Sequence, residues 1–151
     1  MSLIPFKQVD VFTDTPYLGN PVAVILDGQG LSPEAMQRIA NWTNLSETTF
    51  VLPPTQPGAD YRVRIFTPQS ELPFAGHPTL GTAHALMEAG RISAKNGKLV
   101  QECGAGLVEL TVTPCEGASP LIAFKLPEPR LVAMSDAQVD EMEAILEAAH
   151  Q

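Results

Sequence analysis

The chain has 151 residues, of which 44% are hydrophobic and 17% are charged, so it has the composition of one packed domain rather than a disordered chain or a coiled coil. Its net charge of −8, without a basic stripe, argues against a nucleic-acid partner or an anionic membrane surface. No apolar run reaches the ~18 residues of a membrane span, and the first residues lack a secretory signal, so we expect a cytoplasmic protein.

The first half of the chain predicts short strands around one helix. The expected strands are 9–12, 22–26, 50–52 and 61–66. Ser32 is a good helix N-cap and Pro33 suits the first helical position, so a helix should begin there and end between Trp42 and Leu45. Trp42 falls at helical spacing, and we expect it in the core.

The next helix is expected to be buried. It should start with Pro78 in its first position and stop at Gly90, and it is apolar on nearly every side. Such a helix needs a sheet wrapped around it. Further strands are predicted at 98–102, 107–113 and 121–126. Two helices among six or seven strands indicate the α+β class.

The C-terminal tail differs in composition from the rest of the chain. Ser135 and Gln138 match a capping box, and apolar residues recur at helical spacing after them. Five of the 17 acidic residues lie beyond Ser135, with no Lys or Arg among them. We therefore divide the chain into a domain, 1–128, and an acidic amphipathic helical tail, 129–151.

One candidate for catalysis is Glu47, in the segment 44–50 between the first helix and a strand. A carboxylate among hydroxyls at the mouth of an apolar strand can be desolvated and oriented for proton transfer. The alternative is a solvated loop glutamate flanked by capping Ser and Thr residues. The pattern alone leaves both interpretations open.

A second candidate lies in the segment 74–81, where Gly76 and His77 precede the buried helix. Backbone N–H groups and the helix dipole at such a position favour an anion, for example a substrate carboxylate, and His77 can donate a hydrogen bond or carry a proton. The alternative is a tight turn in which Gly76 permits an unusual backbone angle and His77 caps the helix.

Metal and cofactor sites have little support in the sequence. His77 and His84 are seven residues apart, but no third ligand accompanies them, so we predict no metal. Cys103 and Cys115 are too far apart for a paired redox motif and are expected to be reduced thiols. No phosphate-binding loop is present, and we predict no cofactor.

The order and spacing of several motifs resemble those of one family. The motifs are 9–13, 19–24, 44–50, 64–68 and 71–83. Together they resemble the PhzF-like family, named for phenazine biosynthesis, from about Phe6 to Leu126. That resemblance implies a diaminopimelate-epimerase-like fold, in which each of two domains is a mixed, curled β-sheet around a central helix and the active site lies between the domains.

The resemblance also implies a function. The best-known member isomerises a dihydro-hydroxyanthranilate, a cyclic amino acid, without a cofactor. By resemblance, Glu47 is the general acid/base, and the substrate is held by Gly76, His77, Pro78 and Thr79. Related racemases use a cysteine before the helix glycine, where this chain has Ala75, so a two-thiol mechanism is not expected.

The motifs of the family's second domain do not occur in the sequence. We therefore predict an isomerase or epimerase of a small cyclic amino or carboxylic acid that forms a homodimer or pairs with a second domain to complete its site. The alternatives are a half-length, non-catalytic binding or assembly module, and a fragment that needs a second domain for activity.

Overall fold

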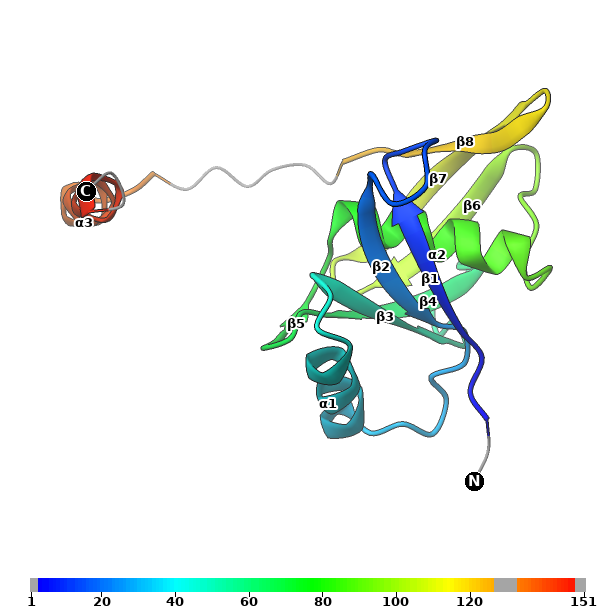
Figure 1. Ribbon diagram of the computed structural model, residues 1–151, viewed down its shortest axis with the longest axis horizontal. Coiled ribbons are helices and arrows are strands. Elements are labelled where there is room, and N and C mark those ends of the chain that lie inside the picture. Colours follow the sequence, from blue (N-terminus) through cyan, green and yellow to red (C-terminus); the bar gives the residue numbers. More distant parts are fainter. Residues whose placement is uncertain (1–2, 127–132, 149–151) are drawn as a thin grey trace.

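The computed structural model describes residues 3–126 and 133–148 (Figure 1). The strands are β1 (Phe6–Val11), β2 (Asn20–Ile25), β3 (Glu47–Leu52), β4 (Tyr61–Phe66), β5 (Glu71–Leu72), β6 (Lys98–Cys103), β7 (Gly106–Cys115) and β8 (Ala118–Phe124). The helices are α1 (Pro33–Thr43), α2 (Gly76–Glu88) and α3 (Asp136–Ala148). The boundary predicted between residues 128 and 129 lies outside the described residues.

The strands form one mixed sheet that curls around α2 (Figure 1). Its order is β1-β2-β3-β4-β6-β7-β8, and the short β5 pairs with β4. The pairs β2–β3 and β4–β6 are parallel, and the other pairs are antiparallel. The predicted α+β class, with a curled mixed sheet around a central helix, is confirmed.

Helix α1 covers the other face of the sheet. The Ser32 side chain accepts a hydrogen bond from the Ala35 N–H at 3.2 Å, as its N-cap pattern predicts. Met36 and Ala40 are buried against Phe50 and Phe66. The expectation that Trp42 lies in the core is wrong, because its side chain is 84% exposed. It stands two positions beyond Ala40, about 200° around the helix, and so points away from the sheet.

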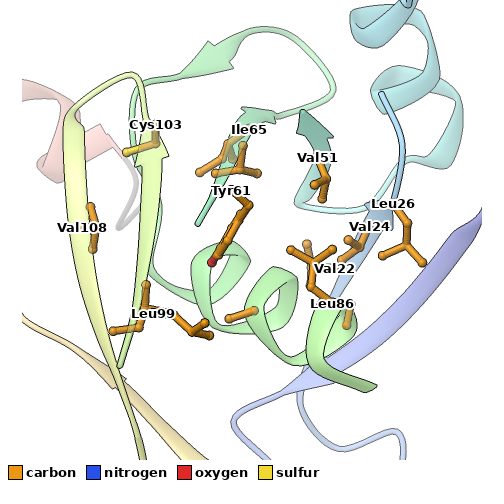
Figure 2. Close-up of a cluster of buried hydrophobic side chains, with 14 of the residues drawn as sticks. Val22, Val24, Leu26, Val51, Tyr61, Ile65, Leu86, Leu99, Cys103 and Val108 are labelled. Atoms are coloured by element: carbon orange, nitrogen blue, oxygen red, sulfur yellow. The ribbon is translucent and has the colours of Figure 1, made fainter. Parts of the chain in front are cut away.

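Helix α2 is buried, as predicted. Its residues Ala83, Ala85 and Leu86 pack against apolar side chains from the strands on its sides, including the Val, Ile and Leu residues that Figure 2 shows converging on it. The helix begins at Gly76 rather than at Pro78. Proline fits inside the first turn because the first N–H groups of a helix have no partner within it.

Several strand boundaries differ from the predicted ones. β1 stops at Val11, because Phe12 adopts a left-handed backbone with φ of 65°. β3 starts at Glu47, three residues before the predicted strand, and this brings Glu47 into the sheet. The short strand β5 was not predicted.

Helix α3 begins as its capping box predicts, since the Ser135 N–H donates to the Gln138 side chain at 3.0 Å. In the described part of the chain, no helix combines the length and the apolar character that crossing a bilayer requires.

Close packing between α2 and the sheet depends on Gly81. A Cβ atom at this position would stand 2.4 Å from Val22 Cγ1 and 3.0 Å from Val11 Cγ2. An exposed helical Gly→Ala change usually stabilises a protein by up to ~1 kcal/mol. We expect Gly81→Ala to lower the free energy of unfolding in urea by about 1–3 kcal/mol instead, because the added methyl overpacks this contact.

The control for this prediction is the double variant Gly81→Ala/Val22→Ala. It removes the Val22 methyl groups, one of which the added Cβ would clash with. Its loss of stability should be clearly smaller than the sum of the two single losses, since the two sites touch. Additive losses, or a Gly81→Ala protein as stable as the wild type, would contradict the packing argument.

Candidate active site

Glu47 is the first residue of β3, and the turn that precedes it is fixed by short-range bonds. Asn44 ends α1 in a left-handed conformation with φ of 56°. The Thr43 hydroxyl donates to the Ala40 carbonyl at 2.9 Å and lies 2.8 Å from the Thr48 hydroxyl. These bonds tie the end of α1 to the start of β3, so the direction of the Glu47 side chain is set by two elements.

The N-terminus of α2 lies beside Glu47. Ala75 is the N-cap residue, and no side chain caps the helix there. The N–H groups of Gly76 and His77 lie in the first turn, where the helix itself supplies no acceptor. They therefore offer hydrogen-bond donors, strengthened by the helix dipole, to an anionic group of a ligand.

The central feature of the site is a carboxylate that faces an imidazole. Glu47 Oε2 lies 3.3 Å from His77 Nε2, and the two side chains are only 16% and 9% exposed. Both atoms are buried, and neither has a partner of hydrogen-bond geometry among the described residues. The two groups therefore lie next to each other, while each keeps hydrogen-bonding capacity for a third group.

Hydrogen bonds inside the core hold the two elements of this pair in place. The Thr82 hydroxyl of α2 donates to the Thr49 hydroxyl of β3 at 2.8 Å, and both residues are fully buried. This bond joins the helix that carries His77 to the strand that carries Glu47. Such buried bonds are sensitive to distance, so they restrict sliding between the two elements.

A second buried network holds the first turn of α2 to β6. The Gln101 amide donates to the Thr79 hydroxyl at 2.9 Å, and the Thr79 hydroxyl donates to the Ala75 carbonyl at 2.9 Å. The Tyr61 hydroxyl donates to the side-chain oxygen of Gln101, Oε1, at 3.2 Å. Burial raises the pKa of Tyr61. The tyrosine therefore stays neutral and serves as a donor.

Phe12 forms a wall of the site that the sequence did not predict. Its ring centroid lies 6.5 Å from that of His77, although the side chain is 71% exposed. The loop after it is closed by the Gly19 N–H, which donates to Asp10 Oδ2 at 3.3 Å. A bulky residue with positive φ is uncommon, and local strain of this kind occurs often at binding sites.

The structure brings together Glu47, Gly76 and His77 of the predicted site. Pro78 and Thr79 are buried, and the Thr79 hydroxyl is used by the network described above. Gln101 and Tyr61 were missed. The alternation of Leu99, Gln101 and Cys103 along β6 would have placed the glutamine on the buried face.

Cys103 is buried and free, and Cys115 is exposed and free. Within residues 3–126 and 133–148, no three His, Cys, Asp or Glu side chains are arranged as ligands of one metal ion.

A mixed sheet curled around one buried helix, as seen here, is the diaminopimelate-epimerase-like fold, present as one of its two domains. Residues 9–151 match the family described as "Phenazine biosynthesis-like protein" (PhzC-PhzF), and the chain belongs to that family.

The relatives include solved structures of the same fold and proteins named as isomerases. The crystal structure of a phenazine biosynthesis protein of the PhzF family from Bacillus anthracis aligns with a TM-score of 0.73 and 39% identity, over 82% of this chain and 40% of that one. Antisense-enhancing sequence 1 of Schizosaccharomyces pombe is 52% identical over 141 residues, which are 93% of this chain and 48% of that protein.

A third relative is the trans-2,3-dihydro-3-hydroxyanthranilate isomerase of Pseudomonas fluorescens. It is 43% identical over 132 residues, which are 87% of this chain and 46% of that protein. The chain thus spans about half the length of these curated relatives.

The network around Thr79 gives a prediction about how the first turn of α2 is held. We expect Thr79→Val to lower the free energy of unfolding by about 1–3 kcal/mol, because it leaves the buried Gln101 amide without its acceptor. Thr111→Val on the exposed face of β7 is the matched control and should change stability by less than about 0.5 kcal/mol. Equal effects of the two changes in urea unfolding would contradict the network.

Proposed function

We propose that this chain provides the acid–base half of a cofactor-independent isomerase site, with Glu47 as the group that moves the proton. The observation that carries the proposal is the buried Glu47–His77 pair at the uncapped N-terminus of α2. A carboxylate in such a place is shielded from bulk water and keeps a lone pair for an incoming proton. Family membership and the isomerase relatives support the same reaction class.

The proposed step is the removal of a proton from the substrate and the return of a proton to it, both by Glu47. The Glu47 carboxylate takes a proton from a C–H bond next to an acid or other electron-withdrawing group, and the C–H electron pair is delocalised onto that group. The developing negative charge is stabilised by the N–H groups at the α2 N-terminus and by the adjacent His77. The carboxylic acid of Glu47 exchanges this proton with solvent and then returns a proton to another carbon or to the opposite face, so the product is an isomer.

The substrate class follows from the charges of the site. Gly76 and His77 provide donors for an anion, so we propose a small cyclic amino or carboxylic acid. The relative from P. fluorescens, by its name, acts on an acid of this kind. A second domain, or a second copy, is proposed to cover the open side of the pair and exclude water.

The test is solvent deuterium incorporation. The purified chain is incubated in D₂O with trans-2,3-dihydro-3-hydroxyanthranilate and a set of small cyclic acids, alone and mixed with the separately expressed C-terminal half of the P. fluorescens relative. Mass spectrometry should show deuterium in at least one acid. Glu47→Gln should slow the incorporation about 10²–10⁴-fold, because the amide cannot accept the proton.

Glu116→Gln, in the exposed turn between β7 and β8, is the matched control and should leave the rate unchanged. Circular dichroism should confirm that both variants fold. Incorporation at the wild-type rate in Glu47→Gln would remove Glu47 from the proposed role. No incorporation into any acid under either condition would overturn the proposed function.

A second candidate function is a binding or assembly module, which the surface of α3 favours. Val139, Met142 and Ile145 are 41%, 50% and 61% exposed, and they follow one another at helical spacing. Figure 1 shows α3 outside the curled sheet. An apolar face without a partner is typical of a protein–protein contact.

Self-association tests this candidate. Light scattering after size-exclusion chromatography should give about twice the 16.2 kDa mass of the chain, and Met142→Glu/Ile145→Glu should return it to a monomer, because the charges oppose burial of this face. Glu141→Gln is the control. A wild-type chain that stays monomeric at every concentration would argue against assembly through α3.

A further inference from the structure

The buried network of Tyr61, Gln101 and Thr79 ends on the peptide group that starts α2. Figure 2 shows the Tyr61 side chain directed from β4 toward this helix. Tyr61 donates to Gln101 Oε1, Gln101 Nε2 donates to the Thr79 hydroxyl, and that hydroxyl donates to the Ala75 carbonyl. Gln101 and Thr79 are fully buried and Tyr61 is 2% exposed, so water does not compete for these bonds.

Every donor in this network points toward α2. The Tyr61 hydroxyl keeps its proton, because burial raises its pKa, and Gln101 Oε1 is the acceptor for that proton. The NH₂ group of Gln101 then faces Thr79 and occupies a lone pair of the threonine oxygen. The Thr79 proton is thereby directed at the Ala75 carbonyl rather than back toward β6.

The Ala75 carbonyl fixes the direction of the Gly76 N–H. It accepts a second bond from the Thr79 N–H at 3.3 Å, so both of its lone pairs are used. The carbonyl and the Gly76 N–H belong to one planar trans peptide group, in which the two bonds point in opposite directions. A carbonyl held against the helix therefore directs the Gly76 N–H out of the N-terminal end of α2, where the helix supplies no acceptor.

The same bonds make the Gly76 N–H a stronger donor. Amide resonance places negative charge on the oxygen and positive charge on the N–H, and hydrogen bonds to the oxygen favour that distribution. Successive hydrogen bonds polarise one another, by roughly 10–30% per bond in the condensed phase. The N–H that follows the Ala75 carbonyl is thus both better oriented and more polar than that of an ordinary first helical residue.

His77 gives independent evidence of a ligand at this end of the helix. Its Nε2 atom has no hydrogen-bond partner among the described residues, and its side chain is only 9% exposed. A buried polar atom without a partner is costly, so its place in the first turn of α2 indicates a group that binds there. The positive end of the helix dipole favours an anion as that group.

We propose that Tyr61, Gln101 and Thr79 are positioning residues, which orient and strengthen the Gly76 N–H as the donor that holds a substrate carboxylate. They act from inside the core, through the Ala75–Gly76 peptide group. The inference rests on the anion site of the proposed function, but it does not depend on proton transfer by Glu47.

The first test is carboxylate binding to the ¹⁵N-labelled 151-residue chain, followed by NMR with benzoate as the probe. Benzoate should move the Gly76 amide proton downfield, because that proton enters a bond to a charged oxygen. Tyr61→Phe removes one hydroxyl from the network and should weaken binding about two- to fivefold. Gln101→Met, which keeps the length of the side chain but has no amide, should weaken it about five- to twentyfold.

Gln101→Glu separates positioning from packing, because the two side chains have nearly the same shape. A neutral carboxylic acid can donate to Thr79 as the amide does, whereas a carboxylate only accepts and draws the Thr79 proton away from Ala75. Burial keeps the acid neutral at low pH, and it ionises as the pH rises. Relative to the wild type at the same pH, benzoate affinity should be unchanged at about pH 5.5 and about tenfold weaker at about pH 9.

Two controls accompany these variants. Asp60 and Cys103 also act on Tyr61, but the wild type carries them too, so the comparison at each pH cancels their titration. Gln69→Glu adds the same charge at an exposed turn position and should bind benzoate like the wild type at both pH values. Urea unfolding shows that every variant is folded under the conditions of the titration.

Three results would overturn the inference. One is equal benzoate affinity in Tyr61→Phe, Gln101→Met and the wild type. A second is an affinity of Gln101→Glu, relative to the wild type, that does not change with pH. The third is no shift of the Gly76 amide in the wild type with benzoate up to about 20 mM, which would leave no anion site for the network to strengthen.

Failure of the proposed isomerase function gives a different pattern. If benzoate binding responds to the variants as expected while no acid incorporates deuterium, the catalytic role of Glu47 fails and the positioning role of the network is supported.

Discussion

The structure depends on the burial of most of α2 inside the curled sheet. The polar side chains on the buried sides of this helix are cut off from water, so they must find partners inside the sheet. Thr82 bonds to Thr49 of β3, and Thr79 bonds to Gln101 of β6. Because hydrogen bonds tolerate little change in distance, these bonds fix both the position of the helix along its axis and its rotation about that axis. The close packing of Gly81 against Val22 requires the helix to lie in this same position.

The site follows from this constraint. In the middle of the helix, the backbone N–H groups bond within the helix. The N–H groups of its first turn have no such partner, and they lie at the end of the sheet where β3 begins. Glu47 is the first residue of that strand and His77 is in the first turn of the helix, so fixing the helix also fixes the distance between the two side chains. The catalytic pair proposed here is therefore oriented by hydrogen bonds inside the core.

Local rules predicted much of the fold. Ser32 marked the start of α1, and the nearly continuous apolar surface of α2 predicted a helix wrapped by a sheet. Trp42 was misplaced because apolar spacing alone does not decide which face of a short helix is buried. The approach of Glu47 and His77 joins residues 30 positions apart and depends on tertiary packing, so only the family resemblance placed them in one site. The positive φ of Phe12 has no signal in sequence, since strain of this kind is imposed by the surroundings.

Phe12 links the proposed catalytic pair to an open groove. Its ring lies beside His77, and the same residue lines the groove between β1 and β8. A group that enters the groove beside β1 would contact Phe12 and restrict the rotamers of a side chain that is otherwise largely exposed. It would thereby complete the wall beside His77 and reduce the access of water to the carboxylate. Occupation of the groove and desolvation of the proposed acid–base pair would thus be linked through one aromatic side chain.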